Sequence, residues 1–110
     1  MDEQVIEYLK RYHSGEINAV TSRELERLFD LRGVEVRKLV NRLRRKGVPV
    51  CSCTQGYYCA ATGEELTHTI RQLLSRSREI TAAATGMMKA FEQYRDDGQL
   101  SLPLTGGDES

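Results

Sequence analysis

Apolar residues recur at helical spacing in three stretches before residue 47. Residues 3–13 place apolar side chains three and four positions apart, and Ser14-Gly15 ends this stretch. Thr21-Ser22-Arg23-Glu24 has the capping-box pattern, in which the first hydroxyl accepts from the third helical N–H, so a short helix is expected after it. Residues 33–46 then carry an apolar stripe at i, i+3, i+4 and i+7, namely Val36, Leu39, Val40 and Leu43. These patterns predict three short helices.

The pattern changes after residue 47 to short β-prone runs. Residues 48–53 and 57–60 flank Thr54-Gln55-Gly56, which predicts a tight hairpin. A second capping-box pattern begins at Thr62, and one long helix is expected from there to about residue 97. We therefore expect a domain over residues 1–61, a long helix over 62–97, and a disordered, acidic tail over 98–110 that contains glycines.

The sixteen basic and sixteen acidic side chains balance, but they are unevenly distributed along the 110 residues. Residues 31–50 have a net charge of +6, with Glu35 as the single acidic side chain, whereas residues 1–30 sum to −3 and residues 96–110 to −4. The basic segment coincides with the helix expected at 33–46. With 39% hydrophobic residues the chain can also bury a small core, which argues against a wholly disordered protein.

A basic helix that follows a capped helix and a short turn suits the major groove of DNA, which admits one α-helix between phosphate-lined rims. Asn41 is suited to a bidentate contact with adenine, and basic side chains on the same helix to guanine or phosphate. Ser22 and Arg23 can hold a phosphate at the start of the preceding helix. The expected DNA contacts are Ser22, Arg23, Arg37, Lys38, Asn41, Arg42, Arg44, Arg45, Lys46, Gln55 and Tyr57.

Residues 1–61 resemble the winged helix-turn-helix domains of bacterial regulators and phage-encoded DNA-binding proteins. The segments that carry this resemblance are Thr21-Ser22-Arg23-Glu24-Leu25, Val36-Arg37-Lys38-Leu39-Val40-Asn41-Arg42-Leu43 and Gly56-Tyr57-Tyr58. The resemblance implies a mostly α fold with a small β-hairpin wing, whose tip contacts the backbone or minor groove of double-stranded DNA. Two other functions stay open: a transcriptional regulator with an incidental tail, and a protein-interaction module without DNA affinity.

The long helix carries a heptad-like stripe in which the steps alternate between four and three residues. The stripe consists of Leu66, Ile70, Leu73, Ser77, Ile80, Ala84, Met87, Phe91 and Tyr94. A helix of roughly 32 residues extends ~48 Å, farther than a domain of this size, so its outer half needs a partner. We expect a homodimer through all of these residues except the weak core formers Ser77 and Ala84. The alternative is a helix that bends near Gly86 and folds back on its own domain.

The tail contains the peptide Gln99-Leu100-Ser101-Leu102-Pro103-Leu104. Its three leucines do not follow the spacing of a helix. This peptide is similar to the motif by which bacterial polymerases and replication regulators bind the β sliding clamp. The resemblance implies that Gln99 enters a small polar subsite, that Leu102 and Leu104 fill a hydrophobic cleft, and that Pro103 pre-extends the chain. Leu100 belongs to the same expected contact set. The departure is Pro103-Leu104, where the commonest form has Leu-Phe. A clamp-binding tail would associate the protein with replication, plausibly that of a phage or mobile element.

The remaining chemistry-bearing residues do not form a catalytic or metal-binding pattern. Cys51, Cys53 and Cys59 lie in the two β-prone runs, and neither His13 nor His68 has the spacing of a fourth zinc ligand. We expect no cofactor, no metal site and no enzymatic activity. No apolar run reaches the length of a membrane span, and Met1-Asp2-Glu3-Gln4 lacks the pattern of a secretory signal. An odd number of cysteines also suits a reducing compartment, so a cytoplasmic location is expected.

Overall fold

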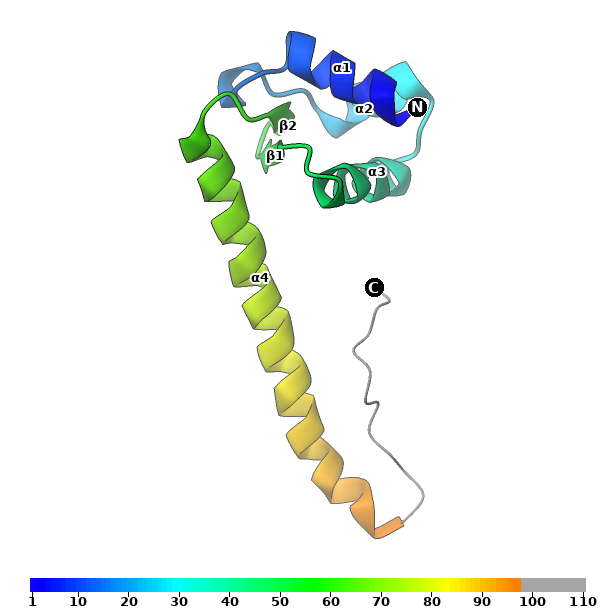
Figure 1. Ribbon diagram of the computed structural model, residues 1–110. Coiled ribbons are helices and arrows are strands. Elements are labelled where there is room, and N and C mark those ends of the chain that lie inside the picture. Colours follow the sequence, from blue (N-terminus) through cyan, green and yellow to red (C-terminus); the bar gives the residue numbers. More distant parts are fainter. Residues whose placement is uncertain (98–110) are drawn as a thin grey trace. The chain divides into compact units, whose positions relative to one another are not determined.

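The computed structural model describes residues 1–97, which are mostly helical with one small antiparallel hairpin (Figure 1). Its elements in chain order are α1 (Asp2–Tyr12), η1 (Glu16–Asn18), α2 (Ser22–Phe29), α3 (Gly33–Arg45), β1 (Val50–Cys53), β2 (Gly56–Cys59), α4 (Gly63–Ala90) and η2 (Phe91–Asp97), where η denotes a 3₁₀ helix. The chain divides into two units, the first of which is Met1–Gln72 and the second of which begins at Leu73.

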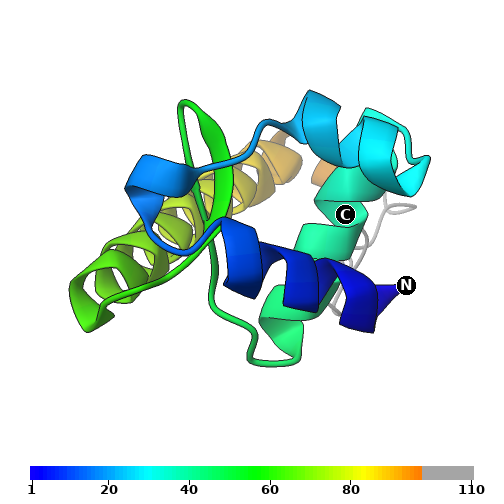
Figure 2. The same ribbon diagram turned by 90° about the horizontal axis from the view of Figure 1, so that it is seen from above.

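The first unit surrounds a core to which the helices α1, α2 and α3 and both strands contribute. The stripe predicted on α3 is fully buried, and Val5 and Leu9 of α1, Leu25 of α2 and Val50 of β1 join it. Seen from above, the three helices gather on one side of this unit and the hairpin runs along the other (Figure 2). Outside the stripe, α3 exposes Arg37, Lys38, Asn41 and Arg45.

Two of the expected helix starts are capped as the sequence predicts. The Thr21 hydroxyl accepts from the Glu24 N–H at 3.1 Å, and the Thr62 hydroxyl accepts from the Glu65 N–H at 3.2 Å. The Glu24 carboxylate pairs with Arg27, and the Glu65 carboxylate accepts from the backbone N–H groups of Ala61 and Glu16. Glu65 thereby joins the first turn of α4 to η1, and these N–H groups lower its pKa.

The hairpin pairs with a third backbone segment between η1 and α2. Val20 and Tyr57 exchange two backbone hydrogen bonds of 2.8 Å, which add an antiparallel bridge beside β2. Gly56 makes this close approach possible: its φ is +137°, and a Cβ at this position would lie 1.9 Å from the Val20 carbonyl oxygen. The two strands are joined by Thr54 and Gln55 alone, because Cys53 pairs directly with Gly56.

Helix α4 is unbroken through Thr85 and Gly86, where the sequence permitted a bend. Its α-helical geometry ends at Ala90, earlier than the expected residue 97, and the chain continues as the 3₁₀ helix η2. Phe91 and Tyr94 therefore leave the 3.6-residue period that the heptad pattern assumed, because a 3₁₀ helix has three residues per turn.

Candidate nucleic-acid interface

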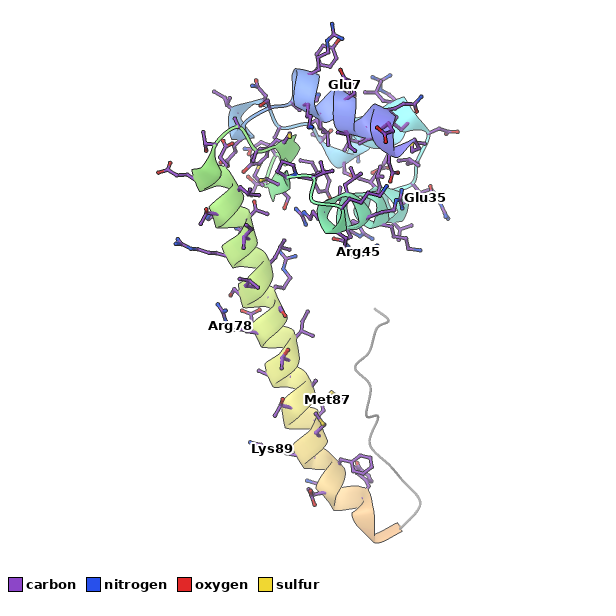
Figure 3. The ribbon with its side chains drawn as sticks, viewed as in Figure 1. Glu7, Glu35, Arg45, Arg78, Met87 and Lys89 are labelled. Carbon is purple, nitrogen blue, oxygen red and sulfur yellow. The ribbon has the colours of Figure 1, made fainter. Side chains whose placement is uncertain are left out.

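The outward side of α3 carries four polar or basic side chains with no side-chain hydrogen bond among the described residues. They are Arg37, Lys38, Asn41 and Arg45, all exposed, and we call them the basic face. At about 100° per residue they lie within a ~100° arc opposite the buried stripe. Figure 3 shows Arg45 on the side of α3 that faces away from α1. The folding of the first unit therefore leaves these groups available to a ligand.

Three further expected DNA contacts, in α3 or directly after it, already have partners within the first unit. Arg42 and Lys46 both bind the carboxylate of Asp2, with N–O distances of 2.8 to 2.9 Å. The Arg44 guanidinium donates to the Val50 carbonyl oxygen at 2.8 Å and fastens α3 to β1. The sequence predicted all three as DNA contacts. Their present partners indicate a structural role for Arg44 and a competition between Asp2 and any anionic ligand for the other two.

The start of α2 presents one of its two expected phosphate contacts to solvent. Arg23 is exposed and makes no side-chain hydrogen bond or ion pair in the described part of the chain. Ser22 is half-buried, and its hydroxyl donates to the Glu26 carboxylate at 3.0 Å. Arg23 can thus reach a phosphate as it stands, whereas Ser22 first has to give up this hydrogen bond.

The two expected DNA contacts of the hairpin, Gln55 and Tyr57, differ in their exposure to solvent. Gln55 is exposed at the turn, and its side-chain oxygen accepts from the Thr54 hydroxyl at 3.2 Å. Tyr57 is half-buried and packs against the core, while its backbone pairs with Val20. Only Gln55 and its neighbour Thr54 therefore lie where a wing tip would touch a ligand.

Sequence reasoning missed two residues at this surface. Val34, in the first turn of α3, is 41% exposed, and its position outside the core stripe was the available signal. Asp2 was missed because its partners lie 40 and 44 positions away along the chain. These two cations hold the pKa of the Asp2 carboxyl far below its ordinary value, so it remains an anion next to the basic face.

The side of the first unit opposite α3 is lined by aromatic, apolar and acidic side chains. A shallow hollow between α1 and α2 is lined by Tyr8, Tyr12, Leu28 and Phe29, with Glu3 and Glu7 among the polar residues at its edge. Arg11 also lines this hollow, so its charged residues sum to −1, in contrast to the basic face.

The expected dimer residues on α4 and η2 divide into exposed and partly buried groups. Ile70, Ile80, Met87 and Tyr94 are between 46% and 76% exposed. Leu66, Leu73 and Phe91 are half-buried. Leu74 and Met88, which were not predicted, are exposed apolar residues of the same helix. The expected clamp contacts Gln99, Leu100, Leu102, Pro103 and Leu104 lie outside the described residues.

The hairpin cysteines resemble small core residues more than ligands. Cys51 and Cys59 are buried, and burial raises the pKa of the Cys59 thiol. Across residues 1–97, no group of three His, Cys, Asp or Glu side chains is arranged to hold a metal ion. Nor does any helix in this part of the chain have both the length and the apolar character needed to cross a bilayer.

Comparison with known proteins adds no further constraint. The chain matches no protein-family model, no curated protein and no solved structure. Its function is therefore inferred from its own residues.

Proposed function

We propose that the chain is a DNA-binding protein whose first unit is a winged helix, with α3 as the helix that enters the major groove. The observation that carries this proposal is the basic face. The fold buries the apolar stripe of α3 completely and leaves Arg37, Lys38, Asn41 and Arg45 exposed on the opposite side. Exposed cations whose side chains make no hydrogen bond within the protein are the groups that displace counterions from DNA phosphates.

The order of residues along the basic face suits a recognition helix, which has to contact both base edges and phosphates. In helix-turn-helix proteins the first turns of this helix approach the base edges. Here they carry Val34, Lys38 and Asn41, which can contact a thymine methyl, a guanine and an adenine respectively. Arg45 lies in the last turn and is suited to phosphate.

The arrangement around α3 supports the winged-helix part of the proposal. Helix α2 precedes α3 after a short turn, in which Asp30 adopts a left-handed conformation with a φ of 56°. The hairpin follows α3 directly and pairs with the segment between α1 and α2 through Val20 and Tyr57. This order is the one that the sequence resemblance led us to expect, and it would bring Gln55 toward the DNA backbone.

We further propose, from the sequence, that the protein is a homodimer and that its tail recruits a bacterial β sliding clamp. Two copies and a clamp contact would raise the effective concentration of the protein at its DNA site. The alternative functions differ in their partners. A plain transcriptional regulator would bind a palindrome without clamp affinity, and an interaction module would bind neither.

The experiment is a salt titration of duplex DNA binding, measured by fluorescence anisotropy on the full chain. Arg37→Ala/Arg45→Ala is expected to weaken binding and to lower the slope of log K against log salt by about 0.9 for each phosphate that the variant no longer binds. Lys10→Ala/Arg11→Ala is the matched control, because it removes the same charge from exposed positions of α1.

The outcomes separate the candidate functions. An unchanged control beside a weakened α3 variant supports the proposal. Equal losses in both variants would mean that net charge alone attracts DNA, and the assignment of α3 would be wrong. A parent chain that binds no duplex even at low salt would leave the interaction module as the function to pursue.

A further inference from the structure

Beyond Gln72, α4 exposes apolar side chains that the described residues do not cover. Ile80 is 65% exposed and Met87 is 76% exposed, and both lie on the heptad stripe. Leu74 and Met88, one position along the helix from that stripe, are 54% and 45% exposed. A single helix cannot bury its own stripe, so this surface is suited to pairing with another helix.

The stripe alternates between large and small residues in a regular way. With Leu73, Ile80 and Met87 at the d positions, the intervening a positions are Ser77 and Ala84. In a parallel pair, each residue of the core faces the same residue of the partner. The two layers on either side of Ile80 would then hold only Ser against Ser and Ala against Ala, and would be underpacked.

We propose that α4 pairs with α4 of a second copy in antiparallel orientation, about a two-fold axis that passes close to residue 82. In an antiparallel pair, a positions face d positions. This register sets Ser77 against the partner's Met87 and Ile80 against the partner's Ala84, so that each central layer combines one large and one small side chain. At each end of the seam, Leu73 of one chain faces the partner's Phe91, the first residue of η2.

The same register accounts for the apolar residues beside the seam. Residues one position after d face each other on one flank of an antiparallel pair. Leu74 therefore lies against the partner's Met88, and Thr81 against its own counterpart at the axis. Ala83 meets its counterpart on the other flank. No charged side chain is buried at these central positions, and both exposed apolar residues outside the stripe gain a partner.

Charge also favours this orientation over the parallel one. Residues 70–81 carry Arg71, Arg76, Arg78 and Glu79, a net charge of +2, whereas residues 83–94 carry Lys89 and Glu92 and are neutral. Parallel pairing would set the two positive segments side by side. Antiparallel pairing sets each against a neutral segment, which removes that repulsion.

Disulfide cross-linking in the full chain tests the orientation. In a background with Cys53→Ser, we would compare Ser77→Cys, Met87→Cys and the double variant under mild oxidation. In the antiparallel pair the two Ser77 positions lie about 15 Å apart along the axis, beyond the reach of a disulfide. The double variant is therefore expected to double its 12.5 kDa mass on a non-reducing gel, while each single variant is not.

A control double variant carries the cysteines on the outer side of the helix. Figure 3 shows Arg78 and Lys89 on one side of α4 and Met87 on another, so Arg78→Cys/Lys89→Cys should not cross-link. Efficient cross-linking of the single variants would establish parallel pairing and overturn the proposal. A monomeric mass of the uncross-linked parent in sedimentation equilibrium would overturn it as well.

The inference rests on the dimer of the proposed function and does not require DNA binding. The cross-linking is carried out without DNA, so a protein that fails to bind duplex can still pass this test. Conversely, a monomeric or parallel chain can still bind DNA through the basic face.

Discussion

Asp2 and Arg42 form a bidentate ion pair that joins the first turn of α1 to the last turns of α3. The Arg42 Nε and Nη2 groups donate to the two carboxylate oxygens at 2.9 and 2.8 Å, and Lys46 Nζ reaches the same carboxylate at 2.8 Å. The Asp2 side chain is only 17% exposed although it binds two cations at the surface. A carboxylate in this position occupies the same groups that a DNA phosphate would use.

Asp2→Asn is therefore expected to tighten duplex binding. The substitution keeps the size of the side chain but releases Arg42 and Lys46 to phosphates. The salt slope should steepen by about 0.9 for each of these cations that binds a phosphate. Glu3→Gln is the matched control, because it changes the net charge equally at an exposed neighbouring position. Equal effects of the two variants would show that Asp2 acts only through net charge.

The same ion pair predicts a difference in acid stability. The pKa of Asp2 is held below its ordinary value of 3.8 in the folded protein because Arg42 and Lys46 stabilise the carboxylate. Its contribution is complete above pH 3.8 and is lost as the pH falls below that value. Between pH 5 and 7 the parent is expected to unfold at a higher denaturant concentration than Asp2→Asn, and this difference should not change with pH. Below pH 3.8 the difference should become smaller as the pH falls. Denaturant titrations followed by circular dichroism measure this difference.

Gly56→Ala is expected to destabilise the first unit by about 3 kcal/mol, the upper end of ordinary substitutions. The added Cβ would collide with the Val20 carbonyl oxygen, and the φ of +137° disfavours any side chain. Gly86→Ala is the comparison, because nothing lies within 4 Å of its Cβ position in α4. That variant should gain up to about 1 kcal/mol of helix stability. A well-folded Gly56→Ala protein, judged by its thermal melt, would contradict the hairpin geometry.

Ala84→Ile distinguishes the two orientations of α4 by the sign of its effect. In the antiparallel pair it sets Ile against the partner's Ile80 in two symmetry-related layers, and overpacking of about 1–3 kcal/mol in each layer weakens the dimer roughly 30-fold or more. In a parallel pair it creates an Ile–Ile layer that strengthens the dimer. Ile80→Ala/Ala84→Ile restores one large and one small residue to the antiparallel layer, so its dissociation constant should return toward that of the parent. Sedimentation equilibrium measures all three.

Removal of residues 98–110 tests the proposed clamp recruitment. The full chain is expected to bind a purified bacterial β sliding clamp saturably, with an affinity on the order of micromolar, because only a few apolar side chains would be buried and association itself costs free energy. The chain that ends at Asp97, and the full chain with Gln99→Ala/Leu102→Ala, should not bind. Isothermal titration of the clamp measures this. If neither the full nor the shortened chain binds, the peptide matches the motif by chance.

Local patterns predicted the elements, and interactions distant in sequence decided which residues of the candidate site are available. The Thr21 and Thr62 caps and the buried stripe of α3 are confirmed, because each depends on residues within two turns of one another. The partners of Arg42 and Arg44 were not predictable in this way. They depend on how α1 and β1 pack against α3, and a basic residue has the same sequence signature whether it binds Asp2, a carbonyl group or a phosphate.

The hydrogen bonds of Glu65 to Ala61 and Glu16 have a consequence for how this part of the chain opens. They join the first turn of α4 to η1, although Glu65 and Glu16 are 49 positions apart in the sequence. Local unfolding takes place in cooperative units, so the first turn of α4 and η1 are expected to lose their protection from amide hydrogen exchange together.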